Sequence, residues 1–366
     1  MRLTIKFRER YLIIISTILL ALIGIVMIYS ASSYSAELQL GDAFYYVKKQ
    51  AVAFVGGLVL MIVGAKIKLE WLKKAKWIIY VFSLILLALI FIPGLGVESY
   101  GATRWLNLGF TTIQPSELSK FGLMIFLAAY MSDHPPIDLK NMIVPLLCGL
   151  SMCVLIMLEP NMSITMCVGM ALVIMIYVAG SRKKWFILMI AVIAAAIPLL
   201  IILEPYRIKR FFAFLDPWQS PKGEGYQLIQ SYYALGSGGL FGVGLFASRQ
   251  KYLFLPFAES DFILSVIAEE TGLFGCLFLI LIFASLVVCG IRVAMNAKEK
   301  FHSLLAAGLV SVIALQTIIN MAVVTGSIPP TGLPLPYVSA GGTSLATFMF
   351  VSGLLYNIAS VTKEKQ

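Results

Sequence analysis

Ten apolar stretches, each long enough to cross a lipid bilayer as a helix, limit what this chain can fold into more than any other feature. One crossing needs roughly 20 apolar residues, because the hydrocarbon core is about 30 Å thick. Only 13% of the residues are charged, well below the share of roughly 25% in soluble domains, which excludes a soluble enzyme. We expect an all-α integral membrane protein with ten transmembrane helices, forming one polytopic domain over residues 1–366. The stretches lie at about residues 11–30, 50–66, 77–93, 115–131, 142–158, 163–180, 185–203, 262–291, 302–325 and 343–360.

The distribution of basic residues predicts the orientation of the chain. A cytoplasmic N-terminus would place 18 of the 28 Lys and Arg residues inside and 9 outside, with Lys120 within a helix. This bias follows the positive-inside rule, so we expect both termini in the cytoplasm. The net charge of +10 then belongs to the cytoplasmic loops and does not call for a nucleic-acid partner.

Cysteine and histidine offer no pattern for metal binding. The five cysteines lie inside apolar stretches, and the two histidines are far apart in the sequence. Neither set has the ligand spacing of a zinc or iron site. We therefore expect no metal chemistry that depends on these residue types.

One outer loop, about residues 204–260 between the seventh and eighth stretches, is much longer than a connection needs to be. Just after the seventh stretch it combines Arg207, Lys209 and Arg210 with aromatic residues. This composition is typical of an amphipathic helix lying in the membrane interface. The cations could anchor the helix to anionic headgroups or bind a lipid-linked pyrophosphate, and both interpretations stay open.

A glycine-rich segment follows in the same loop, at residues 236–244. It is superficially similar to a dinucleotide-binding loop, but no strand of a βαβ unit precedes it. A tight re-entrant turn packed against helices is therefore the preferred interpretation. Backbone amides released by such a turn could still hold a phosphate group.

Asp261 stands where the long loop meets the eighth stretch. It could cap the helix, or it could act as a general base, and one ionised carboxylate can do both. Thirty residues of helix span about 45 Å, more than the membrane requires. Residues 273–291 would suffice to cross, so we expect Asp261, Glu269 and Glu270 at the outer interface or in a wet cavity.

A second charged pair, Glu117 and Lys120, lies one helical turn apart near the start of the fourth stretch. An internal salt bridge and direct contact with substrate are both consistent with this spacing. Arg104 and Trp105, in the preceding outer loop, have the composition of an interfacial anchor.

Six motifs in the same order along the chain resemble the SEDS family of FtsW, RodA and SpoVE, with a spelling most similar to the SpoVE and FtsW members. The resemblance implies a peptidoglycan glycosyltransferase that polymerises lipid II at the outer face of the bacterial cytoplasmic membrane, for septal or spore-cortex wall. It implies a class B penicillin-binding protein as partner. The motifs are GATRWLNLG at 101–109, QPSE at 114–117, YRIKR at 206–210, QKYLFLP at 250–256, SDFI at 260–263 and TGLPLP at 331–336.

The resemblance also implies roles for individual residues. Asp261 falls on the essential loop carboxylate and would be the catalytic base. The substrate-binding residues would be Arg104, Trp105, Gln114, Glu117, Lys120, Arg207, Lys209 and Arg210. At residue 161, where the family usually has aspartate, this chain has Asn161, which suggests a specialised member.

The expected substrates are lipid II and a glycan linked to undecaprenyl pyrophosphate. No cofactor is required by the residues, and a divalent cation, Mg²⁺ or Mn²⁺, at the pyrophosphate is left open. A flippase that moves lipid II without glycosyl transfer is the main alternative, because intramembrane polar groups suit transport equally. A scaffold that only recruits a transpeptidase is a further alternative.

Overall fold

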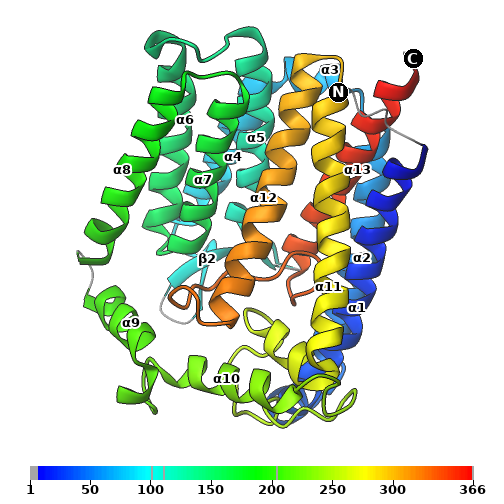
Figure 1. Ribbon diagram of the computed structural model, residues 1–366, viewed down its shortest axis with the longest axis vertical. Helices are drawn as coiled ribbons and strands as arrows, with labels where there is room; N and C mark the ends of the chain where they lie inside the picture. Colours follow the sequence, from blue (N-terminus) through cyan, green and yellow to red (C-terminus); the bar gives the residue numbers. More distant parts are fainter. Residues whose placement is uncertain (1–6, 100–101, 110–111, 203–204, 365–366) are drawn as a thin grey trace.

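The computed structural model describes residues 7–99, 102–109, 112–202 and 205–364, and it is a bundle of long helices. Both ends of the described chain lie at the same end of the bundle (Figure 1). The helices are α1 (Phe7–Leu40), α2 (Tyr45–Lys66), α3 (Leu69–Lys74), α4 (Lys76–Leu89), α5 (Pro115–Asp133), α6 (Leu139–Leu158), α7 (Met162–Val178), α8 (Lys183–Ile202), α9 (Pro205–Leu215), α10 (Tyr226–Gly238), α11 (Ile263–Asn296), α12 (Lys300–Val324) and α13 (Gly342–Glu364).

Each of the ten predicted stretches coincides with one helix of this bundle, so the helical fold of a multi-pass membrane protein is confirmed. Within the described residues, six helices are both long and apolar enough to cross a membrane by length and composition: α1, α2, α6, α11, α12 and α13. Two shorter apolar helices, α4 and α7, are also present there. Ten crossings and the cytoplasmic placement of both termini remain predictions.

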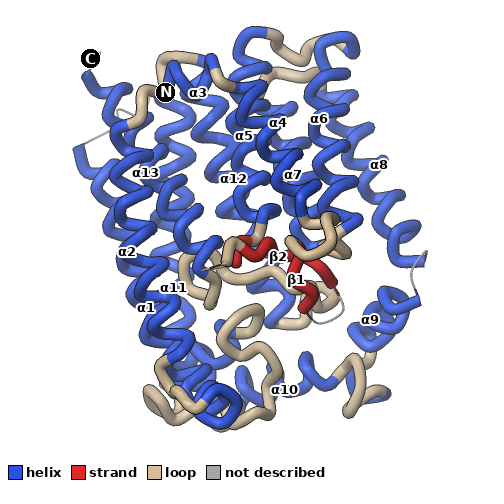
Figure 2. The backbone as a smooth tube through the Cα atoms, turned by 180° about the vertical axis from the view of Figure 1, so that it is seen from behind, coloured by secondary structure: helices blue, strands red, loops and turns tan. Residues whose placement is uncertain are grey.

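The outer loop before α5 differs from the all-helical expectation. It folds into a three-stranded antiparallel sheet of β1 (Gly96–Ser99), β2 (Ala102–Asn107) and β3 (Thr112–Ile113), with β2 in the centre. Strands this short carry too little alternation to be predicted from a sequence. Figure 2 shows β1 and β2 in red between the helix ends and α10, and the central strand β2 carries Arg104.

Close packing between α2 and α13 depends on small residues. A β-carbon on Gly64 would lie 2.5 Å from the carbonyl oxygen of Phe350, and one on Gly353 would lie 2.1 Å from that of Met61. Any side chain at either glycine would therefore collide with backbone. The two helices touch through their main chains, as small residues allow in membrane proteins.

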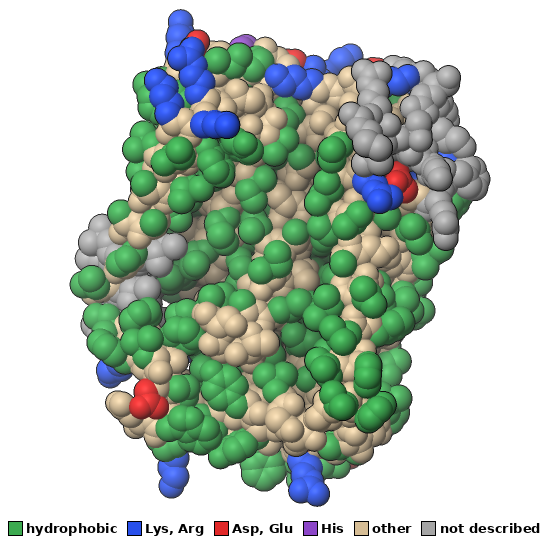
Figure 3. Space-filling view, in the orientation of Figure 1, with side chains coloured by type: hydrophobic (Ala, Val, Ile, Leu, Met, Phe, Trp, Pro, Cys, Tyr) green, Lys and Arg blue, Asp and Glu red, His purple; other side chains and the backbone are tan. Residues whose placement is uncertain are grey.

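The surface of the bundle has the polarity of a membrane protein. In Figure 3, Lys and Arg side chains gather toward the two ends of the molecule, and the band between them is largely apolar. The long outer loop contributes α9, the short 3-10 helix Pro217–Gln219 and α10 to the end opposite the termini (Figure 1). The predicted amphipathic segment that carries Arg207, Lys209 and Arg210 thus forms a helix, α9.

Helix α11 is interrupted at Gly272, where φ is 66° and ψ is −166°. Glycine adopts this backbone conformation without a steric penalty. The interruption separates a short outer segment from the residues after 272, the part that the sequence analysis found sufficient for one crossing. The segment before Gly272 is the part of α11 that matters for the site, because it follows directly after Asp261.

Candidate active site

Asp261 lies in the last turn of the long outer loop, half-buried, immediately before α11. The hydroxyl of Ser260 donates to its Oδ1 at 3.0 Å. Helix α11 begins at Ile263, and its N-cap residue is Phe262, whose side chain forms no capping hydrogen bond. The capping role considered for Asp261 is therefore not the one that the structure shows, and its carboxylate is available for other chemistry.

The surroundings of Asp261 raise the pKa of its carboxyl above the ordinary value for aspartate. Burial raises the pKa of the Asp261 carboxyl from 3.8 to about 6, and the nearby carboxyl of Glu259 adds to the rise. The hydrogen bond from Ser260 and the positive charges of Arg104 and Arg210 oppose it. A carboxylate with a pKa near neutrality, flanked by two cations, suits general base catalysis.

Arg104 extends from the central strand β2 toward the turn between α6 and α7. Its Nε donates to the carbonyl oxygen of Glu159 at 3.2 Å, and its Nη2 donates to that of Pro160 at 2.5 Å. The sheet, the α6–α7 turn and Asp261 thus meet around one guanidinium. The neighbouring Trp105 is half-buried.

Glu117 and Lys120 form the ion pair that their spacing predicts. Lys120 Nζ lies 2.8 Å from Glu117 Oε1, and both side chains are completely buried. Lys120 also donates to Gln316 of α12 at 2.6 Å, while Ser344 of α13 donates to Glu117 at 2.7 Å. The geometry is that of an internal salt bridge joining three helices, and substrate contact by this pair stays a prediction.

The remaining predicted substrate-binding residues are spread over two elements. Gln114 precedes α5, and its backbone amide donates to Thr343 Oγ1 at 3.3 Å. On α9, Lys209 is exposed, and Arg210 forms a 3.2 Å ion pair with Glu224. Arg207 lies in the same helix, but its side chain lies outside the described part of the structure. The charge of Arg210 lowers the pKa of Asp261, so Arg210 lies near that carboxylate.

Glu269 and Glu270 occupy a different environment from the predicted interface or wet cavity. Both are buried, and both bind the loop before Asp261. Glu269 accepts hydrogen bonds from the hydroxyl of Ser248 and from the amide of Arg249, the latter at 3.0 Å. Glu270 accepts from the amide of Phe246 at 3.0 Å. Neither carboxylate faces solvent, because the folded loop supplies the donors that water would otherwise provide.

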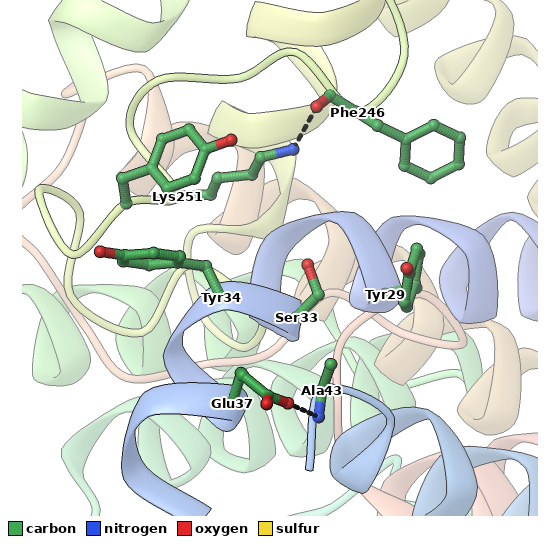
Figure 4. Close-up of a pocket in the computed structure, with 8 residues that line it drawn as sticks. Tyr29, Ser33, Tyr34, Glu37, Ala43, Phe246 and Lys251 are labelled. Atoms are coloured by element: carbon green, nitrogen blue, oxygen red, sulfur yellow. Dashed lines mark hydrogen bonds between the residues drawn. The ribbon is translucent and has the colours of Figure 1, made fainter. Parts of the chain in front are cut away.

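Lys251 completes this arrangement and lines a small pocket (Figure 4). Its ammonium donates to the carbonyl oxygen of Phe246 at 2.5 Å and lies 3.4 Å from Glu270 Oε1. The pocket has a volume of about 380 Å³ and is lined by Tyr29, Ser33, Tyr34, Glu37, Ala43, Phe246, Lys251 and Tyr252. No charge or spacing pattern predicted that Lys251 would bind Phe246 and Glu270, although its place in the motif at 250–256 was a signal.

The glycine-rich segment packs against the interruption in α11. The amides of Val243 and Gly244 donate to the carbonyls of Glu269 and Glu270 at 2.9 and 3.1 Å. In return, the amide of Leu273 donates to Gly239 at 2.9 Å. The tight turn packed against a helix is confirmed, and these two amides are engaged in holding the helix rather than a phosphate.

Residues 10–364 match the model of the FtsW/RodA/SpoVE family, described as cell cycle protein. The chain is 38% identical to stage V sporulation protein E of Bacillus subtilis (strain 168), covering 98% of this chain and 99% of that protein. It is 38% identical to the probable peptidoglycan glycosyltransferase FtsW of Geobacter sulfurreducens (strain DL-1 / KN400), covering 99% and 98%.

Two solved structures share the fold. One is a chain of a peptidoglycan synthase complex that coordinates polymerization and crosslinking, with a TM-score of 0.78, 27% identity and coverage of 96% of this chain and 98% of that one. The other is the rod shape determining protein RodA of Thermus thermophilus, with a TM-score of 0.71, 24% identity and coverage of 96% of each chain.

Proposed function

Because the chain belongs to the FtsW/RodA/SpoVE family, we propose that it is a peptidoglycan glycosyltransferase that polymerises lipid II at the outer face of the bacterial cytoplasmic membrane. The relatives named above carry this activity or a sporulation role in their names. The observation that carries the proposal is Asp261, whose half-buried carboxyl has a pKa of about 6 beside Arg104 and Arg210.

The reaction is a displacement at the anomeric carbon of the lipid-linked strand. The sugar hydroxyl of one lipid II forms the new glycosidic bond, and the bond to undecaprenyl pyrophosphate breaks. Asp261 takes the hydroxyl proton as general base, a contribution worth about 10² to 10⁴ in rate. A single displacement inverts the configuration at the anomeric carbon.

Two arginines supply positive charge for the leaving pyrophosphate. Arg104 and Arg210 lie close enough to Asp261 to lower its pKa, so they also lie near the reacting centre. A fixed cation stabilises charge that develops on the leaving group. Lys209, on the same helix as Arg210, is exposed and would add to this positive charge.

A divalent cation at the pyrophosphate does not have a protein-built site among the described residues. Those residues contain no group of three or more His, Cys, Asp or Glu side chains that could hold a metal. Mg²⁺ is commonly held by one or two carboxylates together with substrate phosphates, so its requirement is decided by experiment. Addition and chelation of Mg²⁺ and Mn²⁺ during polymerisation would measure any requirement.

We also propose a stable complex with a class B penicillin-binding protein. The small residue Gly308 of α12 does not offer a free surface to a partner helix, because it already packs against Met175 and Met124. After the interruption, α11 instead presents apolar side chains to its surroundings, including Phe274, Phe278 and Leu281. Co-purification from native membranes should find a single-pass transpeptidase, and its absence together with full activity alone would contradict the complex.

The decisive experiment is incubation of the purified protein, with and without its partner, with labelled lipid II in liposomes. Glycan strands should form, and Asp261→Asn should abolish them. A flippase would move lipid II across the bilayer without making strands. A scaffold would assemble with the transpeptidase and make no strands by itself.

A further inference from the structure

The segment that carries Asp261 is held by residues that come much later in the chain. Three consecutive main-chain carbonyls accept hydrogen bonds from the region between α12 and α13 or from α12 itself. Each bond fixes one residue, so the segment has little freedom to shift along α11. The pairs are Ala340 N to Glu259 O at 2.9 Å, Ser339 Oγ to Ser260 O at 2.6 Å, and Asn320 Nδ2 to Asp261 O at 2.8 Å.

Asn320 differs from the other two donors because it binds two segments at once. Its Nδ2 donates to the carbonyl of Asp261 and to that of Leu333, each at 2.8 Å, and the side chain is buried. Two carbonyl acceptors require the NH₂ group rather than the amide oxygen, so this orientation follows from chemistry. One side chain therefore ties Asp261 to residues 331–336.

Residues 331–336 also face the Asp261 carboxylate directly. A β-carbon on Gly332 would lie 3.2 Å from Asp261 Oδ2, so the backbone there borders one carboxylate oxygen. The amide bridge of Asn320 joins Asp261 to the residue after Gly332. The bridge consequently holds residues 331–336 at a fixed distance from the Asp261 carboxylate.

A second amide on the same face of α12 supports this arrangement. Gln316, one turn before Asn320, donates to the carbonyl of Pro334 at 2.9 Å. Its oxygen accepts from Lys120 at 2.6 Å. Residues spaced by four lie side by side on a helix. Gln316 and Asn320 can therefore donate to the consecutive carbonyls of Pro334 and Leu333.

We propose that Asn320 is a positioning residue for glycosyl transfer, which places the Asp261 carboxylate against the acceptor hydroxyl without contacting substrate. The inference rests on the proposed function of Asp261. A misplacement of about 1 Å can cost roughly 10²-fold in rate. Loss of the bridge should therefore lower kcat and leave the affinity for lipid II nearly unchanged.

The test is Asn320→Asp, which keeps the size of the side chain, removes both donors and places oxygen against two carbonyl oxygens. The chain offers a matched control in Asn357 of α13, which is also buried and donates to the carbonyls of Gly64 and Ile67 at 3.0 and 2.7 Å. This second bridge lies beside α3, at the end of the bundle away from β2 (Figure 1). Asn357→Asp makes the same chemical change far from the site.

Both variants should lose thermal stability, but only Asn320→Asp should lose kcat, by about 10-fold to 100-fold, with KM for lipid II within about twofold. Equal kcat for the two variants, or a loss confined to KM, would overturn the proposal. If Asn320→Asp does not fold, Asn320→Ala removes the donors without the repulsion. The same loss of kcat, with KM for lipid II nearly unchanged, is then expected of Asn320→Ala.

A second measurement separates this inference from the proposed function. Labelling of the Asp261 carboxyl by a water-soluble carbodiimide, with Asp261→Asn as the blank, should be faster in Asn320→Asp than in the wild type and unchanged in Asn357→Asp. If the wild type makes no strands, the proposed function fails, yet labelling still tests the placement of Asp261. Unchanged labelling in Asn320→Asp would refute the positioning role.

Discussion

Arg104 binds the backbone of Glu159, because its Nε donates to the main-chain carbonyl oxygen of that residue at 3.2 Å. The carboxyl of Glu159 is buried in the α6–α7 turn, and no described residue forms a hydrogen bond with either of its oxygens. Burial raises the pKa of Glu159 from 4.5 to about 8, although the charge of Arg104 opposes the rise. At pH 7 the group is therefore mainly a neutral acid.

The first prediction concerns this buried acid. In the unfolded chain Glu159 ionises near pH 4.5, so its contribution to stability is complete below that pH and is lost as pH rises to about 8. Glu159→Gln removes this loss and should be more stable than the wild type at pH 8, by an amount on the order of a few kcal/mol. Melting curves at pH 5 and pH 8 check this. An equal difference at both pH values would contradict the assignment.

Asp261→Asn should abolish polymerisation while preserving the fold. The amide cannot accept the hydroxyl proton, but it keeps the shape of the side chain. The folded pKa of Asp261 lies above its ordinary value, so ionisation at pH 7 costs stability and the variant should melt at the same or a higher temperature. Strand formation, melting and lipid II binding are measured on the same preparation. Retained polymerisation would remove Asp261 from catalysis.

The pH dependence of polymerisation should report the same carboxyl. The base form of Asp261 dominates above a pKa of about 6, so the rate should fall by about tenfold per pH unit below that value. Arg210 lowers this pKa by its charge. In Arg210→Gln the acidic limb should consequently move to higher pH, and a limb that stays in place or moves to lower pH would show that Arg210 does not act on Asp261.

Asn161→Asp should keep or raise activity. Asn161 caps α7, and its side-chain oxygen accepts from the amide of Ile164 at 3.4 Å. Aspartate caps helices about as well as asparagine, so the helix start should survive the change. Polymerisation by the variant is compared with that of the wild type at equal expression. A large loss would mean that the amide itself is needed.

Lys120→Met should destabilise the protein strongly. It leaves Glu117 buried without its cation, and breaking a buried pair costs about 3–5 kcal/mol. The double variant Glu117→Gln with Lys120→Met should recover much of the loss. Lys73→Met is a suitable control, because Lys73 and Asp133 form a 2.7 Å pair that is partly exposed, and such pairs contribute at most about 1 kcal/mol. Melting temperatures of the three variants decide whether the pair is structural.

The helices could be predicted because membrane helices carry a strong local signal, namely long apolar stretches. The same reasoning found Glu117 and Lys120, since residues three apart share a helix face whatever the surrounding fold. The sheet around Arg104 could not be found in this way. Its strands pair across turns and carry few residues, so their hydrogen bonds leave little trace in a local pattern.

Contacts between distant segments account for the other differences. Glu269 and Glu270 looked like interfacial carboxylates because sequence shows their charge but not the amide donors of Phe246 and Arg249. Asn320 likewise lies inside an apolar stretch, with no local sign that it reaches Asp261, 59 residues earlier. A residue that acts through a backbone carbonyl leaves no pattern of spacing or charge.

The bonds to residues 259–261 have a consequence for biosynthesis. Their donors, Asn320, Ser339 and Ala340, leave the ribosome after Asp261 and after the whole of α11. Chains are made from the N-terminus at about 5–20 residues per second. Several seconds therefore pass between the synthesis of Asp261 and that of the residues that hold it. The segment that carries Asp261 can thus be fixed only after α12 and the residues that precede α13 have been made.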